Sequence, residues 1–160
     1  MVDETYNKQD IATAQLKTAV ALFLNGKDRS SVITLAGAAG NILNQLVKNS
    51  GGEPFVDYAC RVHNAIAGHT PPRNMYKHHI DKKLGITAHK HMGSGDSEYV
   101  EMDLEQSAAD SLIKALSDYT TLNGQEESFV KAFFGWAWEN MDGEEIMESY
   151  KNIPHKMRRK

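Results

Sequence analysis

The segment from Ser30 to Lys48 limits the fold of this chain more than any other part of the sequence. Its apolar residues recur at the spacing of an α-helix and cover a broad face of that helix. The run Ala36 to Gly40 (AGAAG) carries so little side-chain bulk that another helix can approach closely there. Its glycines lack the GxGxxG and GxxxxGK spacings of phosphate loops, so the run predicts tight packing. We therefore expect a central helix surrounded by others, with Ser30 or Ser31 as its N-terminal cap.

Apolar residues recur at helical spacing in four other parts of the chain. One helix is expected from Asp10 to Leu24, and another from Pro54 to near Gly68. Two more lie toward the C-terminal end, with apolar residues spaced from Leu104 to Tyr119 and from Phe129 to Trp138. Both of these are expected to contribute to the core.

A polar stretch rich in histidine and glycine, from Gly85 to Asp96, interrupts this pattern. We predict a mobile loop there, followed by a short extended piece at Tyr99 to Met102. The predicted fold class is all-α, a compact bundle of about five to six helices with the His/Gly-rich loop after the fourth helix. The helical domain is expected to comprise residues 1–141, and residues 142–160 to form a polar, basic C-terminal tail.

The overall composition fits one domain without a disulfide or a membrane anchor. The chain has 160 residues, 41% of them hydrophobic, which is enough for a core of its own. Its apolar stretches are shorter than the roughly 18 residues needed to cross a bilayer, and Met1 to Asp10 is polar, so neither a membrane span nor a signal peptide is expected. The single cysteine, Cys60, is expected to be a small core residue. We therefore expect a cytoplasmic location.

Positive charge is concentrated in one part of the chain. The net charge of −3 argues against a protein that coats nucleic acid. From Arg61 to His91, however, there are six Lys and Arg residues against one acid, Asp81, and six of the seven histidines. This stretch carries +5 and leaves −8 for the rest of the chain. It is either a solvated basic surface or a surface that binds anions.

The sequence Thr70-Pro71-Pro72 predicts the start of the fourth helix. Threonine can cap the first backbone N–H groups, and proline is tolerated at the first helical position. Arg73, Asn74 and His78 then fall in the first two turns. Asn74 and His78 lie about 40° apart around the axis, and the long Arg73 side chain can swing toward their face. We expect the three groups to converge at the positive end of the helix, where a phosphate would bind.

These groups suit the attack of a ribose 2′-hydroxyl on the neighbouring phosphodiester. Histidine is the side chain best suited to proton transfer near neutral pH. The Arg73 guanidinium can donate hydrogen bonds to the phosphoryl oxygens, and Asn74 can orient His78 or hold a phosphate oxygen. Because the nucleophile belongs to the substrate, neither a metal nor a cofactor is required.

The segment Pro72-Arg73-Asn74-Met75-Tyr76-Lys77-His78 resembles the RNxxxH form of the Rx4-6H signature of the HEPN superfamily. These are small α-helical proteins, many of which are RNA-cleaving toxins or defence effectors. The runs 22–24 (LFL) and 31–39 (SVITLAGAA) are similar to the first two helices of a group of uncharacterised bacterial HEPN-like proteins. The resemblance therefore covers Leu16 to Met141.

The resemblance implies a metal-independent endoribonuclease of the toxin or defence type. Arg73 and His78 would be the catalytic pair, with Asn74 as the supporting polar residue. Two copies of the chain would form a homodimer that shares one RNA groove, and an antitoxin or other regulatory protein is an expected further partner. The residues expected to contact the RNA substrate are Lys77, His79, Lys82 and Lys83.

Two alternatives remain open. The domain could be a noncatalytic RNA-binding or protein-interaction module, in which Arg73 and His78 are structural. It could instead bind a metal ion, although no HExxH motif or Cys/His framework is present. The candidate ligands are His79, Asp81, His89 and His91.

Overall fold

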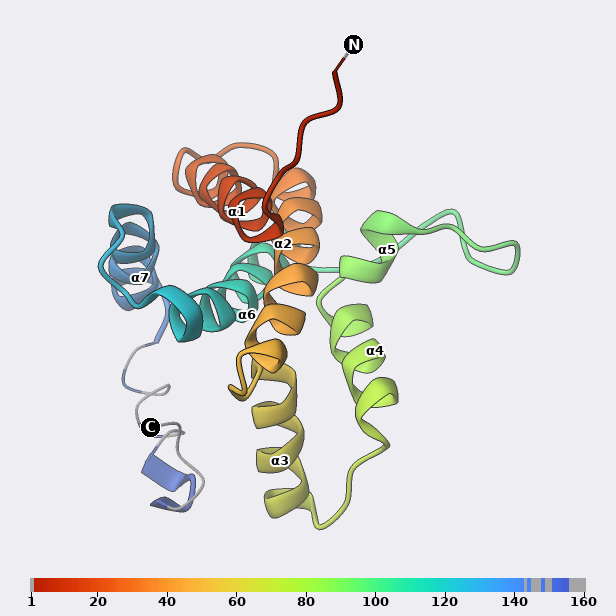
Figure 1. The fold of residues 1–160 in the computed structure, drawn as a ribbon. Helices are drawn as coiled ribbons and strands as arrows, with labels where there is room; N and C mark the ends of the chain where they lie inside the picture. The colour runs from red at the N-terminus through yellow and green to blue at the C-terminus, as the bar shows by residue number, and fades with distance from the viewer. Residues whose placement is uncertain (1, 143, 145–147, 149–150, 156–160) are drawn as a thin grey trace.

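The computed structural model describes residues 2–142, 144, 148 and 151–155, and its regular structure over these residues is entirely helical. In chain order the helices are α1 (Lys8–Leu24), α2 (Arg29–Asn49), α3 (Phe55–Ala67), α4 (Arg73–Lys83), α5 (Ile86–Lys90), α6 (Leu104–Asn123) and α7 (Ser128–Asn140) (Figure 1). The predicted all-α fold is confirmed. Within the described part of the chain, no helix combines the length and the apolar character needed to cross a membrane.

Helix α2 runs through the middle of the molecule, with α1 and α6 packed along it (Figure 1). This confirms the central helix that the broad apolar face predicted, because that face is covered on two sides. Helix α7 packs against α1 and adds aromatic side chains to the core. The buried core residues are Ala12, Leu16, Ala19, Val20, Phe23, Val32, Ile33, Ala36, Ala39, Leu43, Ile86, Ala108, Ala109, Leu112, Ala115, Leu116, Tyr119, Val130 and Phe133.

The small residues of α2 admit two neighbours at close range, as the sequence predicted. A Cβ added to Gly37 would lie 2.6 Å from Cγ2 of Ile86 and 3.4 Å from Cε of Lys90, both from α5. A Cβ added to Gly40 would lie 3.5 Å from Nζ of Lys114, from α6. The absence of a side chain at Gly37 therefore leaves room for Ile86, and the lysine side chains of α5 and α6 pass beside α2 at ordinary contact distance.

Helix α5 corrects part of the loop predicted from Gly85 to Asp96, because residues 86–90 are helical, whereas residues 91–96 lack regular structure. Gly85 adopts a left-handed conformation with φ of 76°, which lets the chain turn sharply out of α4. Ile86 then enters the core against Gly37, and this contact fixes a short helix that its polar sequence does not indicate. The segment that contains Tyr99 to Met102 connects α5 to α6 without regular structure.

His89 ties α5 to the first turn of α2. Its Nδ1 lies 2.7 Å from the carbonyl oxygen of Gly85, and its Nε2 lies 3.1 Å from Oγ of Ser30. Because a carbonyl oxygen can only accept, Nδ1 carries a proton, and in the neutral ring the Ser30 hydroxyl donates to Nε2. Both ring nitrogens of His89 are thus used within the fold.

Two predicted helix caps are wrong. The N-cap of α2 is Asp28, whose carboxylate accepts a 2.9 Å hydrogen bond from the backbone N–H of Ser31. This carboxylate takes the place of the predicted serine caps, because a charged acceptor suits the positive end of a helix. Helix α4 begins only at Arg73, with Pro72 as its N-cap and no capping side chain. Thr70 lies too far upstream to cap it.

One further expectation, a buried Cys60, is wrong, and another, the basic tail, lies mostly outside the described residues. Cys60 is only partly buried, and its Sγ lies 3.6 Å from Oγ1 of Thr70, so it is not a core residue. Its helix, α3, has one buried residue, Val56, because α3 projects beyond the α1–α2–α6 bundle (Figure 1). The predicted basic tail at 142–160 falls mostly outside the described residues.

A matched pair of substitutions tests the close approach of α5 to α2. Gly37→Ala and Gly135→Ala both add a methyl group within a helix, but nothing lies within 4 Å of the Cβ position at Gly135. We expect Gly135→Ala to raise the free energy of unfolding by about 0.5–1 kcal/mol. The free energy of unfolding of Gly37→Ala should be lower than that of Gly135→Ala by about 1–3 kcal/mol, because Ile86 must be displaced. Urea unfolding measures both, and equal effects would show that α5 does not pack tightly on α2.

Candidate functional site

Helix α4 carries the predicted site residues and presents them on two different faces. Figure 1 shows α3 continuing beyond the end of α2, and α4 returning beside α3 toward α5. Arg73, Lys77 and Asp81 follow one another at intervals of four residues and form the face toward the rest of the protein. Asn74 and His78 lie on the next face around the helix and are exposed.

Arg73 is engaged within the fold. Its Nε and Nη2 donate to the two carboxylate oxygens of Asp57 on α3, at 2.5 and 2.9 Å. Nη2 also lies 3.3 Å from the side-chain oxygen of Asn44 on α2. The hydrogen bonds to Asp57 raise the pKa of Arg73 above its usual value. The guanidinium therefore joins α4 to α3 and α2, and its bidentate hydrogen bonding is used by Asp57.

A second ionic contact joins α4 to α6. Nζ of Lys77 donates to Oδ2 of Asp81 at 2.7 Å and to the side-chain oxygen of Asn41 at 3.0 Å. On the other side, Oδ1 of Asp81 lies 3.6 Å from Nζ of Lys114, a residue of α6 that is 2% exposed. Burial lowers the pKa of Lys114, and the nearby carboxylate of Asp81 acts in the opposite direction. Asp81 thus bridges two ammonium groups.

The exposed face of α4 borders a hollow of about 620 Å³, which we call the His78 hollow. It lies between α4, α5 and the segment that follows α5. Three of the predicted residues, His78, Lys82 and His91, line it. The other lining residues are Thr87, Ala88, Met92, Asp96, Ser97, Glu98, Tyr99 and Val100.

The expected convergence of Arg73, Asn74 and His78 does not occur within one chain. Arg73 and His78 are five residues apart, which corresponds to roughly 140° around a helix. Arg73 turns toward Asp57 and Asn44, whereas His78 faces the His78 hollow. Asn74 is exposed and is not among the residues that line the hollow. The catalytic role of the Arg73/His78 pair stays a prediction, but the two side chains have separate environments.

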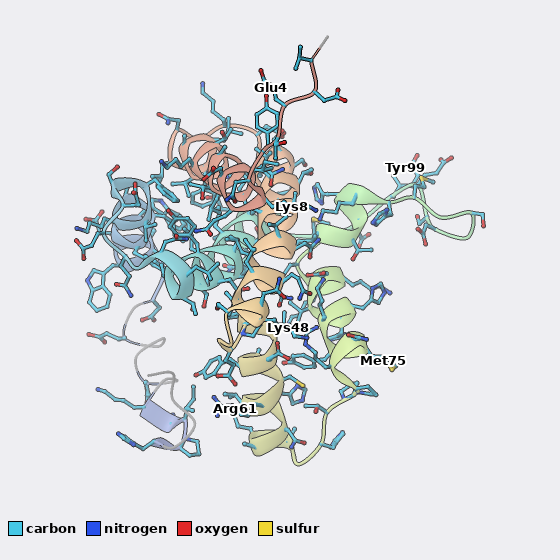
Figure 2. The ribbon with its side chains drawn as sticks, viewed as in Figure 1. Glu4, Lys8, Lys48, Arg61, Met75 and Tyr99 are labelled. Carbon is cyan, nitrogen blue, oxygen red and sulfur yellow. The ribbon has the colours of Figure 1, made fainter. Side chains whose placement is uncertain are left out.

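Sequence reasoning missed two residues of the hollow as candidates for chemistry on RNA. His91 was expected only as a possible metal ligand, although it faces the same space as His78. Tyr99 was expected in an extended piece, and its side chain is 84% exposed. Figure 2 shows Tyr99 on the segment that extends beyond α5, away from the α1–α2–α6 bundle. Only the density of histidines in the segment signalled His91 in advance.

The lining of the His78 hollow contains charges of both signs. Lys82 supplies one ammonium group, and Asp96 and Glu98 supply two carboxylates. The carboxylate of Asp96 accepts a 2.7 Å hydrogen bond from the backbone N–H of Gly93, so part of it is used to hold the turn. Of the other predicted RNA contacts on α4, His79 and Lys83 are exposed outside the lining. Lys77 is also outside it, because its ammonium group is bonded to Asp81 and Asn41 on the inward face of α4.

The four candidate metal ligands are not brought together. Asp81 is buried between Lys77 and Lys114, and His89 is bonded to Gly85 and Ser30. His91 lines the His78 hollow, whereas His79 does not. Among the residues that the structure describes, no group of three or more His, Cys, Asp or Glu side chains is arranged to hold a metal ion. The geometry gives this alternative no support.

Comparison of the chain with protein-family models, with curated proteins and with solved structures finds no match.

A double-mutant cycle tests whether the Arg73–Asp57 contact holds α4 in place. With Arg73→Ala, Asp57→Ala and the double variant, we expect a coupling free energy of about 1–3 kcal/mol in urea unfolding, because the contact is two-pronged and mostly shielded. The Arg61–Glu53 pair is the matched control. Its side chains are each 37% exposed, so its coupling should be about 0.2–1 kcal/mol. Coupling near zero for Arg73 and Asp57 would leave Arg73 available for another role.

Proposed function

We propose that this protein is a metal-independent endoribonuclease that cleaves RNA in the His78 hollow. The observation that carries the proposal is the presence of two imidazoles, His78 and His91, and one ammonium group, Lys82, around a single solvent-accessible space. Cleavage by a 2′-hydroxyl needs one group to accept a proton, another to donate one, and a cation beside the phosphate. The hollow contains a candidate for each.

In this mechanism one of the two imidazoles, His78 or His91, is neutral and removes the proton of the ribose 2′-hydroxyl. A bond forms between O2′ and phosphorus, and the bond between phosphorus and O5′ breaks. The protonated imidazole of the pair donates its proton to the departing O5′. The products are a 2′,3′-cyclic phosphate and a free 5′-hydroxyl, and Lys82 stabilises the negative charge that develops on the phosphoryl oxygens.

The surroundings of the hollow suit a single-stranded substrate. Tyr99 exposes its aromatic ring at the edge, where a base can stack on it. Lys83 and His79 are exposed on neighbouring parts of α4 and extend the polar surface on which the backbone can lie. Protonation of one imidazole offsets part of the negative charge of Asp96 and Glu98.

The resemblance to the HEPN superfamily supports His78 as a catalytic residue, and we retain that assignment. We assign Arg73 a positioning role, because its guanidinium is bonded to Asp57 and Asn44. The homodimer, the antitoxin-type partner and the cytoplasmic location that we expected belong to the same proposal. The exposed aromatic side chain of Trp138 on α7, which is 68% exposed, favours an interface of this kind.

Three alanine substitutions test the catalytic pair. His78→Ala and His91→Ala should each lower RNA cleavage by roughly 10²- to 10⁴-fold, because each removes one proton-transfer group. His69→Ala is the matched control, since His69 is an exposed histidine between α3 and α4 that does not line the hollow, and the activity of this variant should stay near that of the parent. Cleavage is measured in excess chelator, with detection of cyclic phosphate ends. Equal loss in all three variants, or loss on chelation alone, would contradict the proposal.

A second comparison separates a positioning role of Arg73 from a catalytic one. If Arg73 acts through its contact with Asp57, then Arg73→Ala and Asp57→Ala should reduce kcat by similar factors and reduce stability together. Arg73→Lys keeps a cation and should recover only part of the kcat and part of the stability, because one ammonium group cannot replace the two-pronged contact. If Asp57→Ala retained activity while Arg73→Ala abolished it, Arg73 would itself contact the RNA.

A further inference from the structure

We propose that Lys77, Lys90 and Lys114 together form a binding site for a phosphate dianion between α2, α4, α5 and α6. We call these three residues the lysine cluster. The site is separate from the His78 hollow, because Lys77 and His78 are adjacent on α4 and therefore point about 100° apart. The inference does not depend on the proposed ribonuclease activity.

The three lysine side chains come from three different helices and lie near one another beside α2, where Lys77 and Lys114 both act on the charge of Lys90. Lys114 reaches across from α6 at Gly40, and Lys90 crosses α2 from α5 at Gly37, one turn away. Lys77 approaches from α4, with its Nζ 3.0 Å from the side-chain oxygen of Asn41 on α2. Asn41 is exposed and Lys77 is 26% exposed, so the cluster is reached from solvent at this side.

The cluster has more positive than negative charge. The facing carboxylates are Asp81 on α4 and Asp118 on α6, and Asp118 also accepts a 2.7 Å hydrogen bond from the backbone N–H of Phe55 at the start of α3. The two lysines that approach Asp81 within ion-pair distance are Lys77 and Lys114. Lys90 makes no hydrogen bond or ion pair with any residue that the structure describes. Its ammonium group is therefore available to a ligand.

The environment of Lys90 and Lys114 favours an added anion. Burial lowers the pKa of both residues, and the nearby carboxylate of Asp81 offsets part of this effect. The ammonium group of Lys77 acts against Asp81 and lowers the pKa of each. Their charged forms are thus held near other cations and away from much of the solvent, which costs free energy unless an anion compensates. A bound dianion would reverse this cost. The three lysines would then be fully charged around it.

A phosphate fits this site better than a carboxylate. Its oxygens point in several directions and can accept hydrogen bonds from three ammonium groups on different helices, whereas a planar carboxylate is already supplied by Asp81. The exposed amide of Asn41 offers a further donor at the entrance. The phosphate can be the free ion or the terminal group of a monoester, since the proposal requires only the dianionic group.

Calorimetric titration of the full-length chain with inorganic phosphate, at constant ionic strength adjusted with chloride, tests the site. Lys90→Gln should weaken binding roughly tenfold or more, as expected for loss of a hydrogen bond between charged groups. Lys90→Arg keeps the cation and should retain most of the affinity. Lys27→Gln makes the same charge change at an exposed position between α1 and α2 and should leave phosphate binding unaltered. Lys82→Gln removes the ammonium group of the His78 hollow and reports any phosphate that binds there. Unfolding curves for each variant check that the fold is intact.

The possible outcomes are distinct. If Lys82→Gln weakens binding and Lys90→Gln does not, phosphate binds in the His78 hollow and the lysine-cluster proposal is wrong. If phosphate binds no better than chloride, the proposal is also wrong, whatever the result for RNA cleavage. A parallel titration with adenosine monophosphate identifies the source of the group. Binding of both ligands supports a monoester site, and binding of inorganic phosphate alone supports a site for the free ion.

Discussion

The close packing of α5 and α6 against Gly37 and Gly40 of α2 determines where the polar groups of this protein lie. Gly37 receives Ile86 and Lys90, and Gly40 receives the ammonium end of Lys114. A side chain at Gly37 would displace Ile86 and push α5 outward, whereas at Gly40 an added Cβ would be in ordinary contact with Lys114. Because α5 also forms one wall of the His78 hollow, the same packing sets the shape of both candidate sites.

Helix α4 separates two kinds of chemistry by its periodicity alone. Its inward face carries Arg73, Lys77 and Asp81, whose contacts with α2, α3 and α6 hold the α3–α4 extension against the bundle. Its outward face carries His78 and Lys82, which line the hollow. Partly shielded ion pairs suit the first role, since they need good geometry to offset the loss of hydration. Exposed imidazoles suit the second, because proton transfer requires access to substrate.

The candidate site could be predicted only in part from the sequence. His78 and Lys82 were expected at the site, because a helix with a basic, histidine-rich sequence points to anion chemistry. The sequence did not indicate that His78 and His91 line the same hollow, because they come together only through the turn at Gly85 and the docking of α5. A separation of five residues on a helix directs side chains apart. The long, flexible side chain of Arg73 turns instead toward Asp57, whose carboxylate accepts two hydrogen bonds from it.

The sequence by itself determined the helices other than α5, the central position of α2 and the close packing at Gly37, because helical periodicity and missing side-chain bulk are local properties. Only the tertiary structure decided that Arg73 bonds to Asp57, that Asp81 lies between Lys77 and Lys114, and that α5 is a helix. Each of these depends on which charged or apolar group another helix brings within a few ångströms. That choice depends on the packing of distant segments, and no local pattern encodes it.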